Sequence, residues 1–462
     1  MHSETLPTEQ YALGTIPTEA EVTRDVLGRF QEVNSPYWKW LTLLGILTLL
    51  GFVGFLIKAN SGFGDDQRSE WGYMVATLGF LLSSFMAMPI ISAGLRLTKA
   101  NWRRPFTRIA ENMAITGIIV VLMLIPALKA LPPLEGRLNI WFNFPLGAPF
   151  QWDVMAFSTL AFIGLVLLWT VGLPDLAAAR DHLPPSRRRS FISRLSLGWT
   201  GNVRQWRVHR MSVLTMGAMY LLFYPLVMTL MSTDFSAGLL PGVKDAIAPA
   251  TAVAGAVQAG LGMMMITMYL MRRLGGYDRY FTVEQFWALA KPMLALSLLW
   301  FYFWWASFIT FWYGRQPAES ELLRFLMLDQ YRTPLMISFF LNFLGPLIAL
   351  VWNPVRRSIW GPVLVGTGIV FGAFINHIRL YVSAFSIEDP GQHVLSSAPA
   401  TQWPDAPDIL IIVGAVSACV LLFMLVSKII PVISIWEINE GLRLVKVRKF
   451  LGTTVRVIAK SH

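Results

Sequence analysis

Ten long apolar segments run through this chain of 462 residues, and they decide what it can fold into. Each segment is close to the ~20 residues that an α-helix needs to cross the hydrocarbon core of a bilayer. Only 14% of the residues are charged, whereas a soluble domain carries about a quarter. The pattern therefore predicts an all-α integral membrane protein with ten transmembrane helices. The expected spans are 40–57, 71–95, 109–130, 152–173, 211–232, 247–271, 286–312, 334–352, 358–380 and 408–430.

Positive charge is concentrated in every second gap between these segments. Of the 38 Lys and Arg residues, 29 fall in the N-terminal stretch, the even-numbered gaps and the C-terminal tail, if Lys291 just inside span seven is included. The positive-inside rule then predicts that both termini are cytoplasmic, which an even number of spans allows. The net charge of +11 is interpreted as anchoring charge that faces anionic lipid, and it gives no reason to expect nucleic acid.

The N-terminal segment, residues 1–39, is acidic where a cleavable signal peptide would be basic, so we expect no signal peptide here. Thr18 and Glu21 are spaced as a capping box. Apolar residues then follow at near-helical spacing: Val22, Val26, Phe30 and Val33. We expect an amphipathic helix over 18–33 that lies on the cytoplasmic membrane face or against a partner.

Residues that hold redox cofactors are scarce. The single cysteine, Cys419, excludes an intrachain disulfide, an iron–sulfur site made by this chain's cysteines alone, and haem attachment through a cysteine pair. Only two of the six histidines, His209 and His377, lie near spans. The predicted topology places them at opposite membrane faces, roughly 30 Å apart in depth, which is too far to clamp one haem. We therefore expect no cofactor and no metal in this chain, and no phosphate-binding glycine loop is present.

Ionisable and polar residues inside spans are costly, so each is a candidate functional residue. The candidates for a proton path are Glu111, Asp153, Asp234, Glu284, Lys291, Asn342 and His377. The opposing interpretation is that the charged groups face headgroups, cap helices or bind a partner subunit. In that interpretation the Asn342 amide of span eight forms a hydrogen bond to a neighbouring helix.

The predicted proton route runs through the first half of the chain. Glu111 at the cytoplasmic start of span three would take protons up, and Asp153 and Asp234 would release them at the outer ends of spans four and five. Three hydroxyl groups would lie between them: Ser83, Ser84 and Thr116. The second half of the chain offers a comparable but patchier set of polar groups.

Short motifs follow one another in a fixed order between about residues 70 and 430. They are Arg108-Ile-Ala-Glu111, Gly136-Arg137, Trp152-Asp153-Val154, Asp234-Phe235, Tyr280-Phe-Thr-Val-Glu284, Ala290-Lys291, Phe308-Ile-Thr-Phe-Trp-Tyr-Gly314 and Pro317-Ala-Glu319. In this order the chain resembles the NrfD/polysulfide-reductase-type membrane subunits, and more closely the two such subunits of bacterial alternative complex III, a quinol:electron-acceptor oxidoreductase. The last two motifs are most similar to the second, paralogous subunit of that complex, ActF.

The resemblance implies two four-helix bundles, at 71–232 and 247–380, flanked by one helix at each end. The flanking parts are the first span with its outer loop (40–70), the tenth span (408–430) and a cytoplasmic tail (431–462). The resemblance also implies that the protein resides in the cytoplasmic membrane of a bacterium and that it has several partner subunits. These partners are the homologous quinol-oxidising subunit, multihaem cytochrome c and iron–sulfur subunits, and small membrane subunits, so that haem c, iron–sulfur clusters and quinol would belong to them.

Three departures from the quinol-oxidising paralogue, ActC, bear on the chemistry. That subunit has histidines in span two, before the Gly-Arg motif and six residues before the Asp-Phe pair. This chain has Gly79–Ser84, Pro132–Glu135 and Met228 in those places. A quinol site needs a base or hydrogen-bond partner for each hydroxyl. We therefore expect quinol to be oxidised in the partner, and this chain to serve as a scaffold and as a half-channel for protons.

Two alternatives stay open. One is an NrfD-type subunit that binds quinol at a divergent site, for which the aromatic stretch Trp300–Trp312 could supply a slot. The other is a stand-alone secondary transporter. Transporters of that kind have broken helices in matching positions of two halves, and the prolines of these spans show no obvious match.

Overall fold

The computed structural model describes residues 17–132, 149–242, 245–450 and 453–458. In this part of the chain ten helices are long and apolar enough to cross a membrane, which confirms the predicted all-α membrane fold and its number of spans. The spans are Ser35–Ser61, Gln67–Leu97, Thr107–Lys129, Phe150–His182, Val203–Leu239, Ala248–Leu274, Val283–Gly314, Arg332–Val351, Trp360–Phe385 and Ala406–Val426.

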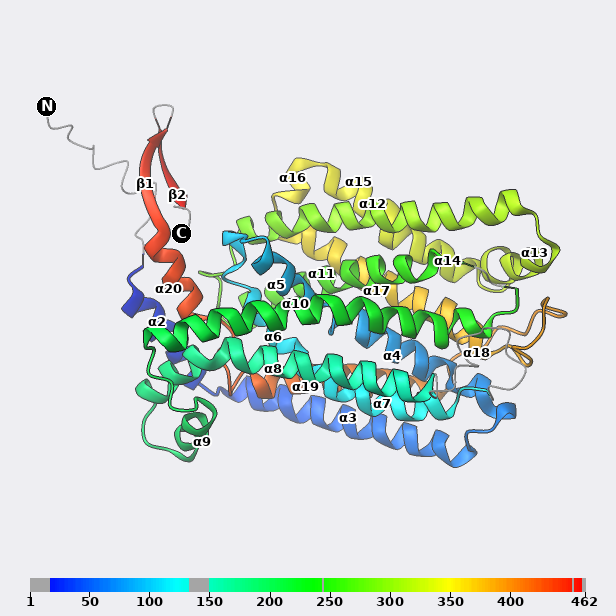
Figure 1. Cartoon of the computed structure of the whole chain (residues 1–462), viewed down its shortest axis with the longest axis horizontal. Helices are drawn as coiled ribbons and strands as arrows, with labels where there is room; N and C mark the ends of the chain where they lie inside the picture. Colours follow the sequence, from blue (N-terminus) through cyan, green and yellow to red (C-terminus); the bar gives the residue numbers. More distant parts are fainter. Residues whose placement is uncertain (1–16, 133–148, 243–244, 451–452, 459–462) are drawn as a thin grey trace, which may run out of the picture.

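The spans lie side by side along the long axis of the molecule, and shorter elements cap its two ends (Figure 1). Their main helices are α3 (Ser35–Ser61), α4 (Gly72–Ser84), α5 (Met88–Leu97), α6 (Thr107–Asn112), α7 (Gly117–Lys129), α8 (Phe150–His182), α10 (Val203–Asp234), α11 (Ala248–Leu274), α12 (Val283–Gly314), α14 (Arg332–Phe339), α15 (Gly345–Val351), α17 (Trp360–His377) and α19 (Ala406–Val426). Short 3-10 turns are η1 (Asp65–Trp71), η2 (Asn101–Arg103), η3 (Met113–Thr116) and η5 (Ala237–Leu239), and π-helical turns are η6 (Arg324–Leu328), η7 (Phe340–Leu344) and η8 (Ile378–Val382).

The elements outside the spans distinguish the two ends of the bundle. One end carries α2 (Glu19–Gln31), α9 (Arg187–Leu195), α16 (Asn353–Arg356) and α20 (Ile435–Leu444), and we call it the basic end because most Lys and Arg residues lie there. The other, which we call the opposite end, carries α13 (Pro317–Leu323) and α18 (Ser383–Phe385). Both the N-terminal helix and the C-terminal helix lie at the basic end (Figure 1).

Several helices continue past the apolar segments that predicted them. Helix α8 was expected to end near residue 173, yet it extends to His182 and includes Asp175 and Arg180. Main-chain hydrogen bonds within a helix do not depend on apolar side chains, so a helix continues into the interfacial region where polar side chains find partners. Hydropathy therefore predicted the apolar part of each helix but underestimated the length of the whole helix.

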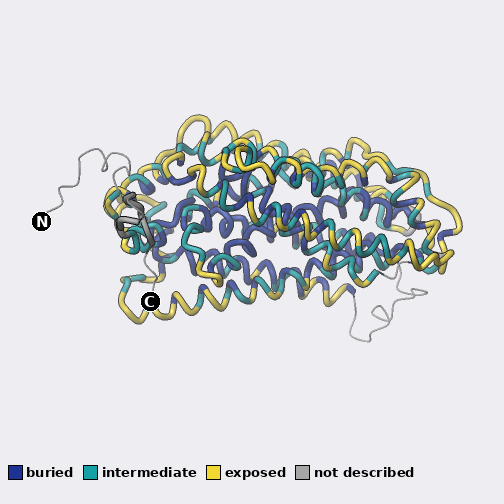
Figure 2. Tube along the Cα trace, turned by 90° about the horizontal axis from the view of Figure 1, so that it is seen from above, coloured by how far each residue is buried: buried dark blue, intermediate teal, exposed yellow. Residues whose placement is uncertain are grey.

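The helices of spans 2–5 pack into a first bundle, and those of spans 6–9 into a second bundle around α11, which touches α12, α17, α4 and α10. The first and last spans, α3 and α19, pack against each other beside the first bundle. Their backbones meet at Gly51 and Gly414, where a Cβ on Gly51 would lie 2.5 Å from the Cα of Gly414. Buried residues line the middle of the molecule, and exposed ones occur mainly on its peripheral helices (Figure 2).

Span two is interrupted in the middle of the first bundle, between α4 and α5. Pro89 has no N–H to continue the helical ladder, and the chain makes a turn at residues 85–87. The carbonyls released by the turn are bonded by tyrosines of α10: Tyr220 donates to Met86 at 2.7 Å and Tyr224 to Leu82 at 3.1 Å. A buried interruption of this kind needs such partners, because no water replaces the lost bonds.

The two terminal regions extend the membrane fold. The predicted N-terminal helix is confirmed as α2, where Glu21 N–H donates to Thr18 Oγ1 at 3.3 Å and Thr18 N–H to Glu21 at 2.9 Å, and it packs on α20. After α20 the chain forms an antiparallel hairpin of β1 (Val445–Phe450) and β2 (Thr453–Ile458). The hairpin was not predicted, although its alternation of apolar and basic residues is typical of a strand.

Candidate functional site: buried polar groups of the membrane region

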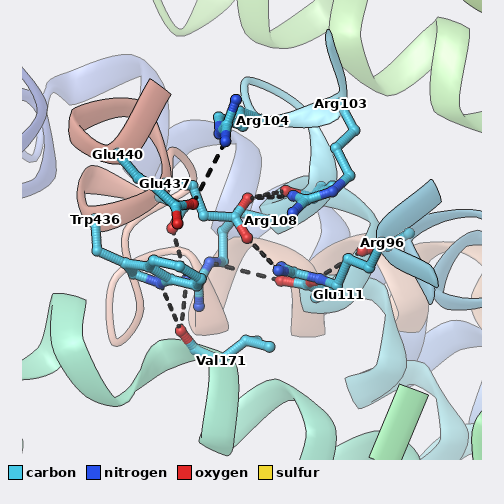
Figure 3. A network of polar contacts seen from close by, with 12 residues as sticks. Arg96, Arg103, Arg104, Arg108, Glu111, Val171, Trp436, Glu437 and Glu440 are labelled. Atoms are coloured by element: carbon cyan, nitrogen blue, oxygen red, sulfur yellow. Dashed lines mark hydrogen bonds and ion pairs between the residues drawn. The ribbon is translucent and has the colours of Figure 1, made fainter. Parts of the chain in front are cut away.

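A cluster of arginines and carboxylates fills the basic end of the first bundle (Figure 3). Glu111 of α6 is fully buried, and its Oε1 accepts hydrogen bonds from Arg96 Nε at 2.9 Å and Ser92 Oγ at 2.7 Å. Arg96 also forms an ion pair with Glu437 of α20. The predicted proton-uptake residue is therefore locked between helices of the first bundle and the C-terminal helix.

Glu437 is the residue through which α20 joins this cluster. Its carboxylate receives hydrogen bonds from Thr107 Oγ1 at 2.7 Å and Arg103 Nη1 at 3.1 Å, besides its pair with Arg96. Burial alone would raise the pKa of the Glu437 carboxyl, but Arg96 and Arg103 and the Thr107 bond outweigh it and lower the pKa to about 2. Glu437 thus stays ionised at any physiological pH.

Arg108 makes a second set of bonds that fixes the start of α20. Its Nη2 donates to Asp175 Oδ2 and to the Val171 carbonyl, each at 2.7 Å. The other oxygen of Asp175 accepts the main-chain N–H groups of Ile435 at 3.0 Å and Trp436 at 3.2 Å. A carboxylate at a helix N-terminus satisfies N–H groups that have no partner within the helix.

At the opposite end, Asp153 and Asp234 come together as the topology predicted. Asp153 lies in the first turn of α8, Asp234 is the last residue of α10, and both side chains are fully buried. The carboxyl groups of Asp153 and Asp234 lie close enough for their charges to interact. Two carboxylates this close repel each other when both are ionised.

The three hydroxyl groups expected between these ends do not form a continuous chain. Ser84 donates to the Phe80 carbonyl at 2.6 Å and Thr116 to the Met113 carbonyl at 2.7 Å, so both bond their own helix. Ser83 points toward the second bundle, where its Oγ lies 2.7 Å from His377 Nε2. That contact is a polar link between the two bundles.

The second-bundle candidates fall into two separate groups. Glu284 and Lys291 are exposed on α12 near the basic end, and the Lys291 ammonium lies 3.8 Å from the centroid of the Trp287 ring. Asn342 and His377, by contrast, are buried and line one cavity. The structure therefore does not bring the four residues into one path.

The cavity that Asn342 and His377 share has a volume of about 160 Å³ and lies between α11, α12, η7 and the end of α17. Its walls are mainly apolar and aromatic, and its deep polar residues include Gln258 and Arg379. Gln258 Nε2 donates to Ser297 Oγ at 2.8 Å and to the Asn342 carbonyl at 2.6 Å. Both π-helical turns of spans eight and nine border the cavity, and such turns are frequent at functional sites.

Sequence reasoning missed Gln258 as a site residue, although a lone amide inside an apolar span was the signal that could have revealed it. The Gly136-Arg137 motif, and the place before it where a histidine was sought, lie outside the described residues. No protein-family model matches the chain, and no curated protein matches it either.

Proposed function

We propose that this chain is a non-redox membrane subunit of a quinol-oxidising complex of the alternative complex III type, and that its first bundle is a half-channel for protons. The observation that carries the proton proposal is the Asp153–Asp234 pair, two carboxyl groups buried together at one end of an apolar bundle. Burying such groups is costly, and membrane proteins retain them mainly where protons or ions pass.

The two ends of the first bundle suit proton uptake and release in different ways. At the basic end, a proton that reaches Glu111 would weaken its bonds with Arg96, so uptake is coupled to a rearrangement of the ion cluster. At the opposite end, a proton on either carboxyl group would relieve the repulsion between the two charges, so the pair suits the transient holding of one proton. Because Ser84 and Thr116 bond their own helices, water must complete the route between these ends.

The subunit assignment is supported by the ordered motifs and by the ten spans. In the predicted orientation both termini and the basic end face the cytoplasm of a bacterium, and the carboxyl pair faces outward. The homologous quinol-oxidising subunit, multihaem cytochrome c, an iron–sulfur protein and small membrane subunits would be its partners. The peripheral helices α3 and α12 expose apolar faces that suit lipid or such partners.

The transporter alternative finds less support. The break in span two lies in the first helix of its bundle, whereas the π-helical turns of the second bundle lie in its third and fourth spans. Alternating-access transporters place their interruptions at corresponding positions of two repeats. These interruptions do not correspond.

The assembly is tested by purifying the tagged chain in mild detergent, staining for haem and identifying co-purifying proteins by mass spectrometry. We expect a multihaem cytochrome and an iron–sulfur protein in constant ratio to the chain. A chain that is fully membrane-inserted yet purifies alone would contradict the subunit assignment.

The proton route is tested in the assembled complex with the double variant Asp153→Asn and Asp234→Asn. We expect the number of protons released per electron in liposomes to fall, because amides cannot carry the proton. Glu284→Gln is the matched control, since that carboxylate is exposed and outside the route. Unchanged turnover and an unchanged proton-to-electron ratio with normal assembly would leave the chain as a scaffold only.

A further inference from the structure

An open groove at the basic end separates the start of α10 from α20 and has a volume of about 740 Å³. Small-molecule sites occupy about 300–1,000 Å³. Glu437 and Asp175 hold α20 to the first bundle, so both walls of the groove are fixed before any ligand arrives. The groove is therefore preformed, and its lining indicates what it can bind.

Basic side chains outnumber carboxylates in this groove. It is lined by Arg207, Arg210 and Arg443 and by Glu19 and Glu440. Arg443 pairs with Glu19 through two hydrogen bonds of 2.7 Å and 2.9 Å, and Arg210 lies 3.7 Å from Glu440. Arg207 forms no ion pair with any residue that the structure describes. The lining thus keeps one unbalanced positive charge, which suits a ligand with a single negative charge.

An exposed apolar row begins at the groove and continues along α10. Met211 lines the groove, and Leu214, Leu222 and Leu226 follow it at helical spacing, all of them exposed. Arg207 lies one turn before Met211 on the same face of the helix. A small soluble phosphate compound would leave this row bare, whereas the acyl chains of a phospholipid would cover it. The ligand that fits both parts of this face is a lipid.

Two tryptophans indicate the depth of the groove in the membrane. Trp206 and Trp436 both line it, and their ring centroids are 5.7 Å apart. Figure 3 shows Trp436 on α20, beside the buried ion cluster. Tryptophan is enriched at the headgroup level of membranes, because its indole has an apolar body and a polar N–H. The groove therefore lies at the level of phospholipid headgroups.

A buried acceptor inside the groove narrows the choice of headgroup. Asn439 lines the groove, and its Oδ1 is buried without a hydrogen-bond partner among the described residues. An amide oxygen only accepts, so the missing partner must be a donor. A headgroup hydroxyl is such a donor. An ethanolamine ammonium is one too, but it would cancel the charge of the phosphate and leave the groove with its unbalanced positive charge.

We infer that this groove binds one phospholipid with a singly charged phosphodiester and a hydroxyl-bearing headgroup, of the phosphatidylglycerol type. The phosphate lies against Arg207 and Arg210, a headgroup hydroxyl donates to Asn439 Oδ1, and an acyl chain covers Met211 and Leu214. The inference does not depend on the quinol-oxidising complex, because its test measures lipid binding alone.

The test titrates the purified full-length chain in mild detergent with dioleoyl lipids and counts bound lipids by native mass spectrometry. We expect one phosphatidylglycerol to bind about tenfold more tightly than phosphatidylethanolamine. Arg207→Gln should weaken this binding about tenfold, because a charge-assisted hydrogen bond is lost. Arg204→Gln is the matched control, since Arg204 is exposed on the same helix, carries the same charge and does not line the groove. Equal losses for the two variants would mean that net charge alone attracts the lipid, and would overturn the site.

A second comparison tests the headgroup. Phosphatidylmethanol has the same charge as phosphatidylglycerol but no headgroup hydroxyl, so it should bind more weakly, and Asn439→Ala should remove that difference. Equal affinity of the wild-type chain for these two lipids would overturn the role of the hydroxyl. Phosphatidylethanolamine that binds as tightly as phosphatidylglycerol would overturn the singly charged headgroup. Glycerophosphoglycerol, the headgroup without acyl chains, would overturn the assignment of a lipid if it bound as tightly as phosphatidylglycerol.

Discussion

The basic end and the second-bundle cavity both bury an arginine among apolar helices, but they surround it differently. At the basic end, Arg96 lies between two carboxylates, Glu111 and Glu437, and all three side chains are almost completely excluded from solvent. In the cavity, the one hydrogen-bond partner that the described residues offer Arg379 is the amide of Asn376. The first arrangement is balanced in charge within the protein, whereas the second is not.

This difference bears on what each arginine contributes to the stability of the fold. A buried ion pair adds little net stability over apolar residues, but removing one member is costly because the other stays buried and charged. The basic-end cluster therefore fixes α20 under the first bundle. Arg379 already carries that cost, because the amide of Asn376 does not neutralise its charge.

The largest effect should come from removing the carboxylate that joins α20 to the cluster. Glu437→Ala removes the carboxylate between Arg96 and Arg103, so that two cations face each other. We expect a loss of about 3–5 kcal/mol in the free energy of unfolding. Unfolding can be followed with a thiol-reactive dye, because the only cysteine, Cys419, is fully buried in α19.

Glu440→Ala is the matched control for that variant. Glu440 lies one turn further along α20, is partly exposed, and approaches Arg104 at 3.5 Å and Arg210 at 3.7 Å. Exposed pairs of this kind contribute about 0–1 kcal/mol. If Glu437→Ala and Glu440→Ala lower the free energy of unfolding equally, burial of the cluster does not increase its contribution to stability.

Acid should weaken the same cluster over a defined pH range. The folded-state pKa of Glu437 is about 2, below the ordinary value of 4.5, so its contribution is complete above the ordinary value and is lost as pH falls toward 2. The shift corresponds to about 3 kcal/mol. Unfolding measured between about pH 5 and about pH 3 should show a decline that Glu437→Gln reduces. An identical pH profile in that variant would exclude Glu437 as the cause.

The sequence predicted the spans and the Asp153–Asp234 pair for a simple reason. Each span is a local apolar run, and two consecutive spans are neighbours in space, so residues at their shared end meet. The basic-end cluster could not be found in this way. It depends on Glu437 returning to Arg96 and Thr107 from more than 300 residues away, and no local pattern encodes that contact.

The cavity was beyond sequence reasoning for a different reason. Hydropathy averages over a window, so Gln258 is hidden by apolar neighbours. The π-helical turns at Asn342 and Arg379 each place one extra residue in a helix, and tertiary packing decides where that happens. Which polar groups remain unpaired is likewise known only once the helices have been packed.

Replacing each buried arginine with methionine tests the comparison between the two regions directly. Arg379→Met removes an uncompensated charge, so the free energy of unfolding should be unchanged or about 1 kcal/mol higher. Arg96→Met leaves Glu111 and Glu437 buried without their shared partner and should be strongly destabilising. The dye assay on Cys419 measures both. A similar loss for the two variants would show that Arg379 has a structural partner of equal value.

The smallest effects should come from the two candidates that the structure leaves on the surface. Glu284→Gln and Lys291→Gln should each change the free energy of unfolding by less than about 0.5 kcal/mol, because exposed charges contribute little and the Lys291 ammonium only rests on the Trp287 ring. Neither should alter proton release in the assembled complex, since neither lies near the Asp153–Asp234 pair. If one of them lowers proton release without affecting assembly, the proton path runs along the outside of the second bundle, at an interface with a partner subunit, and the first bundle is the structural one.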